Sequence, residues 1–278
     1  TMEAFPHDAT LGVGTEEDAY DILVQTFDDV KYGFLAYGEN GYGALNGDRE
    51  AGHAWVNSPR VQEDIQRYKK MVDVLIVQVH AGVELLDVPI PEWRARYRRL
   101  VDLGADAVIC HHPHVMQGIE EYKGKLICYS LGNFYFDYPS NHPQWNLGAV
   151  LTLDFQNKEC VAYDFQVVKK TGTRVELEEE SVSATWLKNL NEKLNASSYI
   201  DYVNEAAVRD WEQHHATYYA KPFNGLAKYS LKNMLKHAKR VLFNKSIDYN
   251  MIWHNMFIES NKWLVERAIR YKFRQEQK

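Results

Sequence analysis

Three histidines of this chain follow two apolar segments, at positions where proteins place metal ligands. His80 ends the run Val-Asp-Val-Leu-Ile-Val-Gln-Val-His, and His112 and His114 come directly after Ala-Asp-Ala-Val-Ile-Cys-His. Nearly continuous Val, Ile and Leu indicate strands that are buried on both faces of a parallel sheet. Imidazole and carboxylate ligands together suit divalent Zn, Mn or Fe. The spacing therefore predicts a divalent-metal site formed by His80, His112 and His114.

The segment His112-Pro113-His114 has a spacing that favours convergence. Alternate residues of an extended segment point the same way, so both imidazoles can reach one centre. Pro113 removes a backbone donor and stiffens the segment. His111 then points the opposite way and is expected to bind a backbone carbonyl or to support a ligand. The other histidines show no convergent spacing: His7, His53, His142, His214, His215, His237 and His254.

Two further polar residues near these strand ends are candidate catalytic residues. Glu84 lies four residues after His80, and Gly82 between them permits a tight turn. Glu84 can orient a metal ligand or meet a substrate, and a plain surface carboxylate is the alternative. Asn133 follows Gly132 in Tyr-Ser-Leu-Gly-Asn-Phe, and its amide can contact an anionic group or stabilise a turn.

The elements around these residues predict an α/β fold. The strand Val74–Val79, the helix Pro91–Leu103 and the strand Ala107–Cys110 follow one another, and Gly104 ends the helix. This order forms a parallel unit with a right-handed crossover. In open α/β sheets, ligands bind just beyond the carboxyl ends of the strands. The histidines are therefore expected at one rim of one sheet.

Three further pairs of apolar segments flank short turn sequences and predict β-hairpins. They are Ile22–Phe27 with Val30–Tyr37, Gln117–Tyr122 with Lys125–Ser130, and Gly148–Phe155 with Cys160–Val168. The other expected elements are a helix end at Thr1–Phe5, a short strand Ala9–Val13, a rim loop Gly38–Asn57 and a helix from Ser58 to about Met71.

Composition narrows the function classes. The chain has 278 residues, is 45% hydrophobic and has a formal net charge of -6, which argues against a general nucleic-acid binder. The sequence has no run near the roughly 18 apolar residues that a membrane-spanning helix needs. Walker A, Gly-x-Ser-x-Gly and Cys-x-x-Cys sequences are absent, so nucleophilic Ser or Cys chemistry has little support.

The character of the sequence changes after residue 180. Apolar residues there have helical spacing, which predicts an α/β domain at 1–180 and a helical extension at 181–278. Lys and Arg gather in Lys228–Lys245 and in the tail Arg267–Lys278. The basic helices either present a solvated face or make peripheral contact with a membrane or an acidic partner.

The ordered motifs resemble those of a known family. His-Ala-Gly-Val-Glu, then Gly-Ala-Asp-Ala-Val-Ile-Cys-His-His-Pro-His-Val, then Tyr-Ser-Leu-Gly-Asn-Phe are similar to the CapA-type capsule-synthesis family. The resemblance covers about Gly12 to Phe136. That family is associated with bacterial capsular polymers, including poly-γ-glutamate, and resembles a branch of the calcineurin-like metallophosphoesterases.

The resemblance implies a calcineurin-like β-sandwich flanked by helices, with two divalent metals (Mn, Zn or Fe) at one rim. In such sites a metal-bound hydroxide attacks phosphorus while the metals stabilise the developing charge. By motif position, His80 and His112 would bind one metal and His114 the other.

The chain also departs from the family pattern. The family usually has Trp where Ala81 stands and Gly where Cys110 stands. Its earlier Gly-Asp, Asp and Asn-Asn-His motifs have no counterpart, so we expect a fold that is truncated at its N-terminus. Three histidines alone are then expected to hold one metal rather than a bridged pair.

Two functions follow as hypotheses. The first is a metal-dependent hydrolase of the phosphoesterase type that serves capsule or exopolymer synthesis and acts on an anionic polymer or phosphoester. The second is a non-catalytic component of the machinery that assembles or exports the polymer. A plain interaction module is a weaker third. Either location, cytoplasmic or at the cell envelope, is compatible with the sequence.

Overall fold

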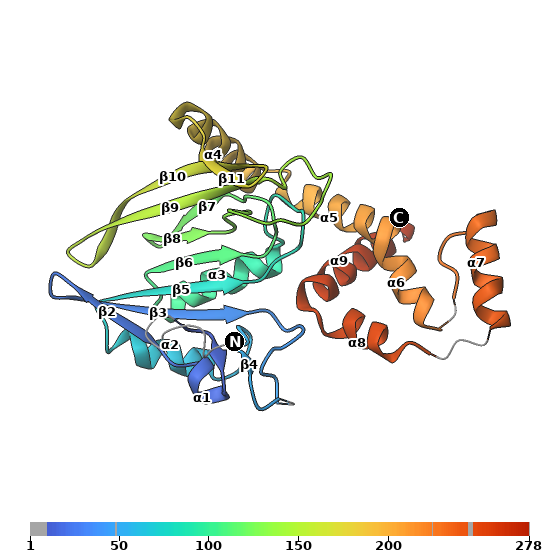
Figure 1. Ribbon diagram of the computed structural model, residues 1–278, viewed down its shortest axis with the longest axis horizontal. Helices are drawn as coiled ribbons and strands as arrows, with labels where there is room; N and C mark the ends of the chain where they lie inside the picture. Colours follow the sequence, from blue (N-terminus) through green and yellow to red (C-terminus); the bar gives the residue numbers. More distant parts are fainter. Residues whose placement is uncertain (1–9, 48, 224, 244–246, 278) are drawn as a thin grey trace. The chain divides into compact units, whose positions relative to one another are not determined.

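The computed structural model describes residues 10–47, 49–223, 225–243 and 247–277 (Figure 1). The chain forms two compact units, Thr1–Tyr199 and Ile200–Lys278. The helix end expected at Thr1–Phe5 lies outside the described residues. Of the strand expected at Ala9–Val13, Ala9 lies outside the described residues and only Val13 belongs to a strand, β1 (Val13–Gly14), which pairs with β4 (Gly52–His53).

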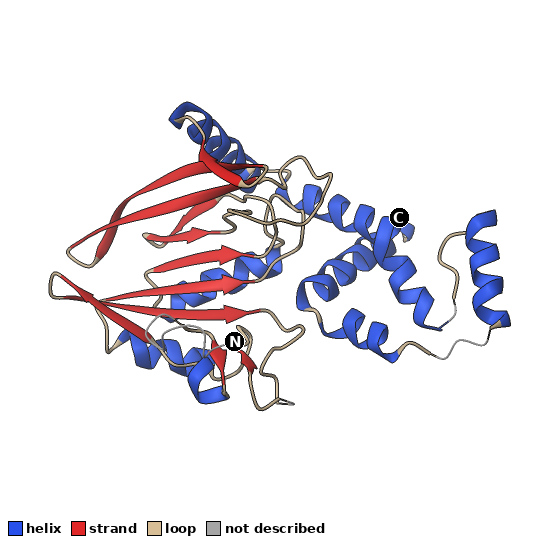
Figure 2. Cartoon of the chain, viewed as in Figure 1, coloured by secondary structure: helices blue, strands red, loops and turns tan. Residues whose placement is uncertain are grey.

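A six-stranded sheet forms the centre of the first unit, with strand order β2-β3-β5-β6-β8-β7 (Figure 2). Its four central strands are parallel, and the two edge strands are antiparallel to their neighbours. The strands are β2 (Leu23–Phe27), β3 (Val30–Gly38), β5 (Val74–His80), β6 (Ala107–His111), β7 (Ile119–Tyr122) and β8 (Lys125–Cys128).

The two crossover helices cover one face of this sheet. They are α2 (Val61–Lys69) and α3 (Pro91–Leu103), which contact β5 and β6 respectively. Gly104 ends α3 with a φ of 128°, a conformation that glycine adopts without strain. In β5, Val74, Leu75 and Val77 are all fully buried, which explains the uninterrupted apolar run in the sequence.

A second sheet packs on the other face. It consists of β9 (Leu147–Gln156), β10 (Glu159–Thr171) and β11 (Arg174–Leu177) in the order β11-β10-β9, and the helix α4 (Glu180–Asn195) lies beside it. The core between the sheets joins residues of β6, β7 and β8 to residues of β9, β10 and α4. The expected α/β class, with two sheets flanked by helices, is thereby confirmed.

Three details differ from the sequence expectation. The helix expected from Ser58 begins at Val61, and its N-cap Arg60 makes no side-chain capping bond. The strand β11 was not anticipated, because Arg174–Leu177 is short and mostly exposed. The first unit extends to Tyr199 rather than residue 180, because α4 packs against β10 through the same core.

The second unit is helical, as the sequence predicts. Its main helices are α5 (Tyr199–Asp210), α6 (Ala216–Ala220), α7 (Leu231–Leu242), α8 (Tyr249–Phe257) and α9 (Glu259–Glu276). Two short helical turns, Trp211–His215 and Lys221–Phe223, complete the described part of this unit. Within the described residues, no helix combines the length and the hydropathy needed to cross a lipid bilayer.

Candidate metal centre

Three neighbouring parallel strands deliver polar side chains to one rim of the central sheet. Gly38 of β3 pairs with His80 of β5, and His80 pairs with His111 of β6. The residues that follow, Glu39 and His112, therefore begin the loops at the same rim. This is the carboxyl end of the parallel strands, where α/β folds bind ligands.

The backbone after β6 turns rather than continuing as an extended strand. His112 has a φ of 105° and His114 a φ of 60°, both in the left-handed region. The extended conformation assumed from the sequence is therefore wrong for this segment, although the two imidazoles do converge. Such conformations cost about 1–3 kcal/mol each and persist where the surroundings enforce them.

The loop after β5 is held against this turn by backbone hydrogen bonds. The Ala81 amide donates to the carbonyl of His111 at 3.0 Å, and the Leu85 amide donates to the carbonyl of Pro113 at 2.8 Å. Gly82 between them has a φ of 135°, and a Cβ there would lie 2.9 Å from the Pro113 ring. The tight turn expected at Gly82 is thus present, and it brings Glu84 beside the histidines.

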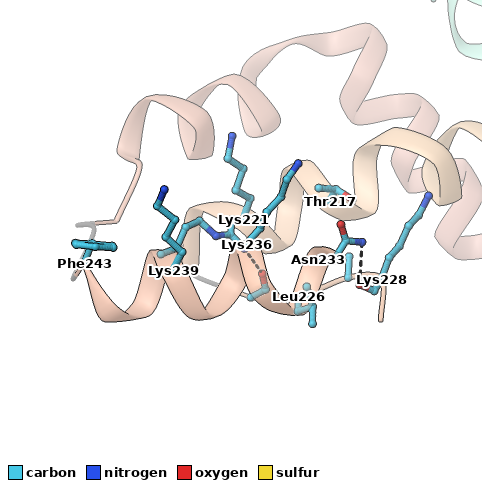
Figure 3. A pocket seen from close by; sticks show the side chains of 11 residues that line it. Thr217, Lys221, Leu226, Lys228, Asn233, Lys236, Lys239 and Phe243 are labelled. Atoms are coloured by element: carbon cyan, nitrogen blue, oxygen red, sulfur yellow. Dashed lines mark hydrogen bonds between the residues drawn. The ribbon is translucent and has the colours of Figure 1, made fainter. Parts of the chain in front are cut away.

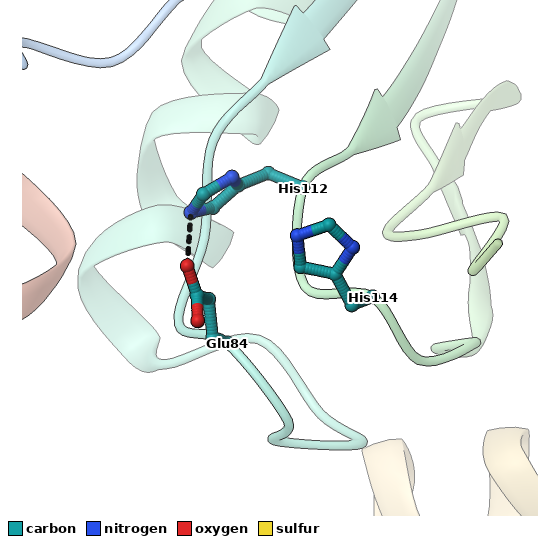
Figure 4. Close-up of side chains that lie close together, drawn as sticks. All are labelled: Glu84, His112 and His114. Carbon is teal, nitrogen blue, oxygen red and sulfur yellow. Dashed lines mark ion pairs between the residues drawn. The ribbon is translucent and has the colours of Figure 1, made fainter. Parts of the chain in front are cut away.

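Glu84, His112 and His114 form a cluster of possible metal ligands (Figure 4). One donor atom from each lies within 4.8 Å of the other two. His112 Nε2 lies 3.9 Å from Glu84 Oε1 and 3.3 Å from Glu39 Oε1. One nitrogen and two carboxylates can thus face a common ion.

His80 approaches the other side of the same imidazole. Its Nε2 lies 3.2 Å from His112 Nδ1. This separation is that of a hydrogen bond between the two rings, so His80 meets the ring nitrogen that points away from the Glu39 carboxylate. His112 thus has His80 at its Nδ1 and the carboxylates of Glu39 and Glu84 at its Nε2.

The electrostatics favour neutral imidazoles at this rim. Burial, followed by the neighbouring rings of His80 and His114, lowers the pKa of His112 to about 3. Burial and the nearby His111 and His114 lower the pKa of His80 to about 4. Only the neutral ring coordinates a metal, so protons do not compete for these ligands at neutral pH. The donor set thus fits a divalent cation.

Asn133 fixes the orientation of His114. Its Nδ2 donates to the carbonyl of Trp145 at 2.9 Å, so its Oδ1 is the atom that accepts from His114 Nδ1, also at 2.9 Å. With its proton on Nδ1, His114 keeps the Nε2 lone pair for a ligand. The rings of Phe136 and Trp145 lie 5.0 and 5.1 Å from that of His114 and restrict its rotation.

This contact gives a first prediction. Asn133→Ala removes the acceptor that selects the His114 tautomer, and we expect it to lower the affinity for Zn²⁺ by about 10–100-fold. Asn133→Asp keeps an oxygen acceptor at the same place and is expected to stay much closer to the wild type. Calorimetric titration of both variants measures the effect. Equal losses in the two variants would contradict a role through His114.

Every candidate from the sequence lies at this rim, and their roles stay predictions. His111 is partly buried, and burial lowers its pKa. Glu39 is the residue that sequence reasoning missed. It is 8% exposed and begins a segment rich in Gly and Asn that was expected to be only a loop. The signal for it was a carboxylate directly after a third apolar strand, Val30–Gly38.

Comparison with known families gives a match over the same part of the chain. The sequence profile described as "Bacterial capsule synthesis protein PGA_cap" matches residues 9–138. The PGA biosynthesis protein CapA of Bacillus subtilis is 47% identical over 73 residues, which are 26% of this chain and 19% of that protein. The capsule biosynthesis protein CapA of Bacillus anthracis is 32% identical over 145 residues, or 49% of this chain and 35% of that protein.

The matched part is thus a minority of each CapA relative. Among solved structures, one similar chain is a candidate 5'-nucleotidase from Staphylococcus aureus crystallised with α-ketoglutarate. It is 14% identical, with a TM-score of 0.37, over 60% of this chain and 33% of that chain.

Proposed function

Because residues 9–138 belong to the CapA-type family of bacterial capsule synthesis proteins, we propose that this chain serves the synthesis of a capsule polymer through a metal-dependent phosphoesterase site. The cluster of Glu84, His112 and His114 at the carboxyl rim of the sheet is the observation that supports this proposal. A divalent ion bound there would acidify a water ligand and polarise a phosphoryl oxygen.

Some side chains of the rim would bind the ion, and another would face the substrate. His112 and His114 would hold the ion, and Asn133 keeps the His114 proton on Nδ1. The buried Glu39 carboxylate adds negative charge 3.3 Å from His112 Nε2, and this charge would stabilise a bound cation. His80, hydrogen-bonded to His112 Nδ1, would orient the His112 ring so that Nε2 faces the ion.

Glu84 lies on the side from which a substrate would arrive. Its side chain is 63% exposed, whereas that of His112 is 20% exposed. An exposed carboxylate beside the ion can accept a proton from a water that attacks phosphorus. We therefore assign Glu84 the role of general base, and an anionic polymer or phosphoester the role of substrate.

The experiment is hydrolysis of bis(p-nitrophenyl) phosphate by the chain with and without added Mn²⁺ or Zn²⁺. Among the described residues, Glu84, His112 and His114 form one cluster of donors that suits one ion, so we expect a slow rate that depends on metal. His112→Ala is expected to abolish that rate. Binding of two ions per chain with rapid hydrolysis would contradict the single-ion site.

A cluster of donors that suits one ion rather than two also favours a second candidate function. A single-ion centre lacks the second metal that clamps the leaving group in two-metal hydrolysis. The chain would then be a non-catalytic component of the polymer assembly or export machinery that keeps a structural metal. Stoichiometric metal binding without any metal-dependent hydrolysis would support this second function over the first.

A further inference from the structure

The helix α7 of the second unit buries none of its twelve residues. Isolated helices of this length are marginal in water, and most helices in proteins are stabilised by packing of an apolar face. The Ser230 side chain caps its first turn by accepting from the Asn233 amide at 3.2 Å. A cap alone adds about 1 kcal/mol, so α7 needs a further surface on which to pack.

The apolar residues of α7 form one continuous face. At 100° per residue, Leu231, Leu235 and Leu242 project on the same side, with Met234 and Val241 next to them. Leu242 is 80% exposed and Leu231 is 76% exposed. Two exposed aromatic residues flank the helix, with Tyr229 before the cap and Phe243 at the C-terminal end, where Phe243 also lines the hollow beside α7.

The opposite face of α7 is basic and is turned toward its own unit. Lys236 and Arg240 line a hollow of about 670 Å³ together with Lys221 and Lys228 (Figure 3). Lys239, which lies between the basic face and the apolar face, also borders this hollow. Arg240 Nη2 donates to the carbonyl of Gly225 at 3.2 Å, and Asn233 Nδ2 donates to the carbonyl of Lys228 at 3.1 Å. These bonds hold the basic face inward and leave the leucines outward.

The charge around α7 contrasts with the rest of the chain. The formal net charge of the whole is -6, yet the sequence between Glu212 and Asp248 contains no Asp or Glu. That stretch has basic residues at Lys221, Lys228, Lys232, Lys236, Lys239, Arg240 and Lys245. A cationic region behind an exposed apolar face complements an anionic lipid surface, which offers negative headgroups above an apolar interior.

We propose that α7 binds the surface of an anionic phospholipid bilayer. The helix lies in the plane of the interface, with Leu231, Leu235 and Leu242 inserted at the boundary of headgroups and acyl chains. Lys232 and Lys239, at the edge of the apolar face, reach the phosphates while their aliphatic stems stay in the apolar layer. Tyr229 and Phe243 lie at headgroup depth, as interfacial aromatic residues do.

The test is co-sedimentation of the full chain with vesicles of equal parts phosphatidylglycerol and phosphatidylcholine, and with vesicles of phosphatidylcholine alone. We expect binding to the anionic vesicles that weakens as salt is added. Leu242→Glu is expected to weaken binding at least about tenfold, because it places a charge where the leucine would be inserted into the lipid. Leu177→Glu, at a leucine of β11 in the other unit that is 63% exposed, is the matched control and should bind as the wild type does.

A second test removes positive charge from the edge of the apolar face instead of changing a leucine. The double variant Lys232→Gln, Lys239→Gln is expected to weaken binding about thirtyfold at low salt. The matched double variant Lys169→Gln, Lys188→Gln removes the same charge from exposed positions outside the second unit and should change binding by less than about threefold.

Three outcomes would overturn the proposal. One is the absence of binding to anionic vesicles. Another is a dimer in sedimentation velocity that Leu242→Glu converts to a monomer without any vesicle binding, because a second copy would then cover the face. The third is binding of soluble poly-glutamate that excludes vesicles and survives Leu242→Glu, because the basic hollow would then serve a polyanion.

Discussion

His112→Ala is expected to lower the affinity of the chain for Zn²⁺ or Mn²⁺ by more than about 100-fold. The His112 imidazole has a close polar atom at each of its two ring nitrogens, His80 Nε2 at 3.2 Å and Glu39 Oε1 at 3.3 Å. Loss of an outer-shell support already costs about 10–100-fold, so loss of the central ligand costs more. Competition with a fluorescent chelator at neutral pH measures the affinity.

His237→Ala is the control for this variant. His237 lies on α7 in the second unit and is only partly buried, so its removal should leave metal affinity unchanged. His114→Ala is expected to resemble His112→Ala, since His114 belongs to the same cluster. Equal metal uptake by all three variants would remove the assignment of the site.

Glu120→Gln is expected to destabilise the first unit by about 3 kcal/mol. Glu120 of β7 accepts from Arg94 Nη2 at 3.0 Å and from Arg98 Nε at 3.1 Å, and also from the Tyr129 hydroxyl. The Glu120 side chain is 12% exposed and that of Arg94 is 15% exposed. Removal of one partner from such a pair leaves a charge desolvated and unpaired, which costs about 3–5 kcal/mol.

The pH dependence of this effect follows from the pKa of Glu120. Burial opposes its ionisation, but hydrogen bonds from Arg98, Arg94 and Tyr129 outweigh burial and lower the pKa from 4.5 to about 2. Below pH 4.5 Glu120 therefore binds a proton in the unfolded chain, whereas in the folded chain it stays ionised until the pH approaches 2. The stabilisation is complete above that pH and is lost as the pH falls toward 2.

Urea unfolding at neutral pH and at a pH below 4.5 measures the free energy of unfolding of both proteins. The difference between wild type and Glu120→Gln should be largest at neutral pH and should shrink once the pH falls below 4.5. Glu121→Gln, at the exposed next position of the same strand, should change stability by less than about 0.5 kcal/mol. A constant difference at every pH would show that the glutamate acts through shape rather than charge.

The sequence predicts the central part of the fold because its local signals agree there. The helix Pro91–Leu103 is found with the predicted bounds, since Pro91 at its start and Gly104 at its end are unambiguous signals. The hairpin between β2 and β3 turns at Asp28 and Asp29, both with positive φ, as a two-residue turn requires. Uninterrupted apolar runs likewise predict the buried strands β5 and β6.

The candidate site was less predictable because it depends on contacts between distant segments. The loop Gly38–Asn57 was expected at the rim, but the approach of Glu39 to His112 depends on the parallel pairing of β3 with β5, which the local sequence does not reveal. His112 and His114 converge because both have left-handed backbone, a conformation that the sequence His-Pro-His does not predict. The role of Asn133 beside His114 likewise depends on the loop that carries Trp145.

Anomalous diffraction from crystals of the chain soaked in Zn²⁺ or Mn²⁺ tests the central claim most directly. We expect one strong anomalous peak per chain at the carboxyl rim of the central sheet, within about 2.0–2.3 Å of nitrogen atoms of His112 and His114. A peak away from these residues, or imidazoles that stay bonded only to His80 and Asn133 at saturating metal, would contradict it.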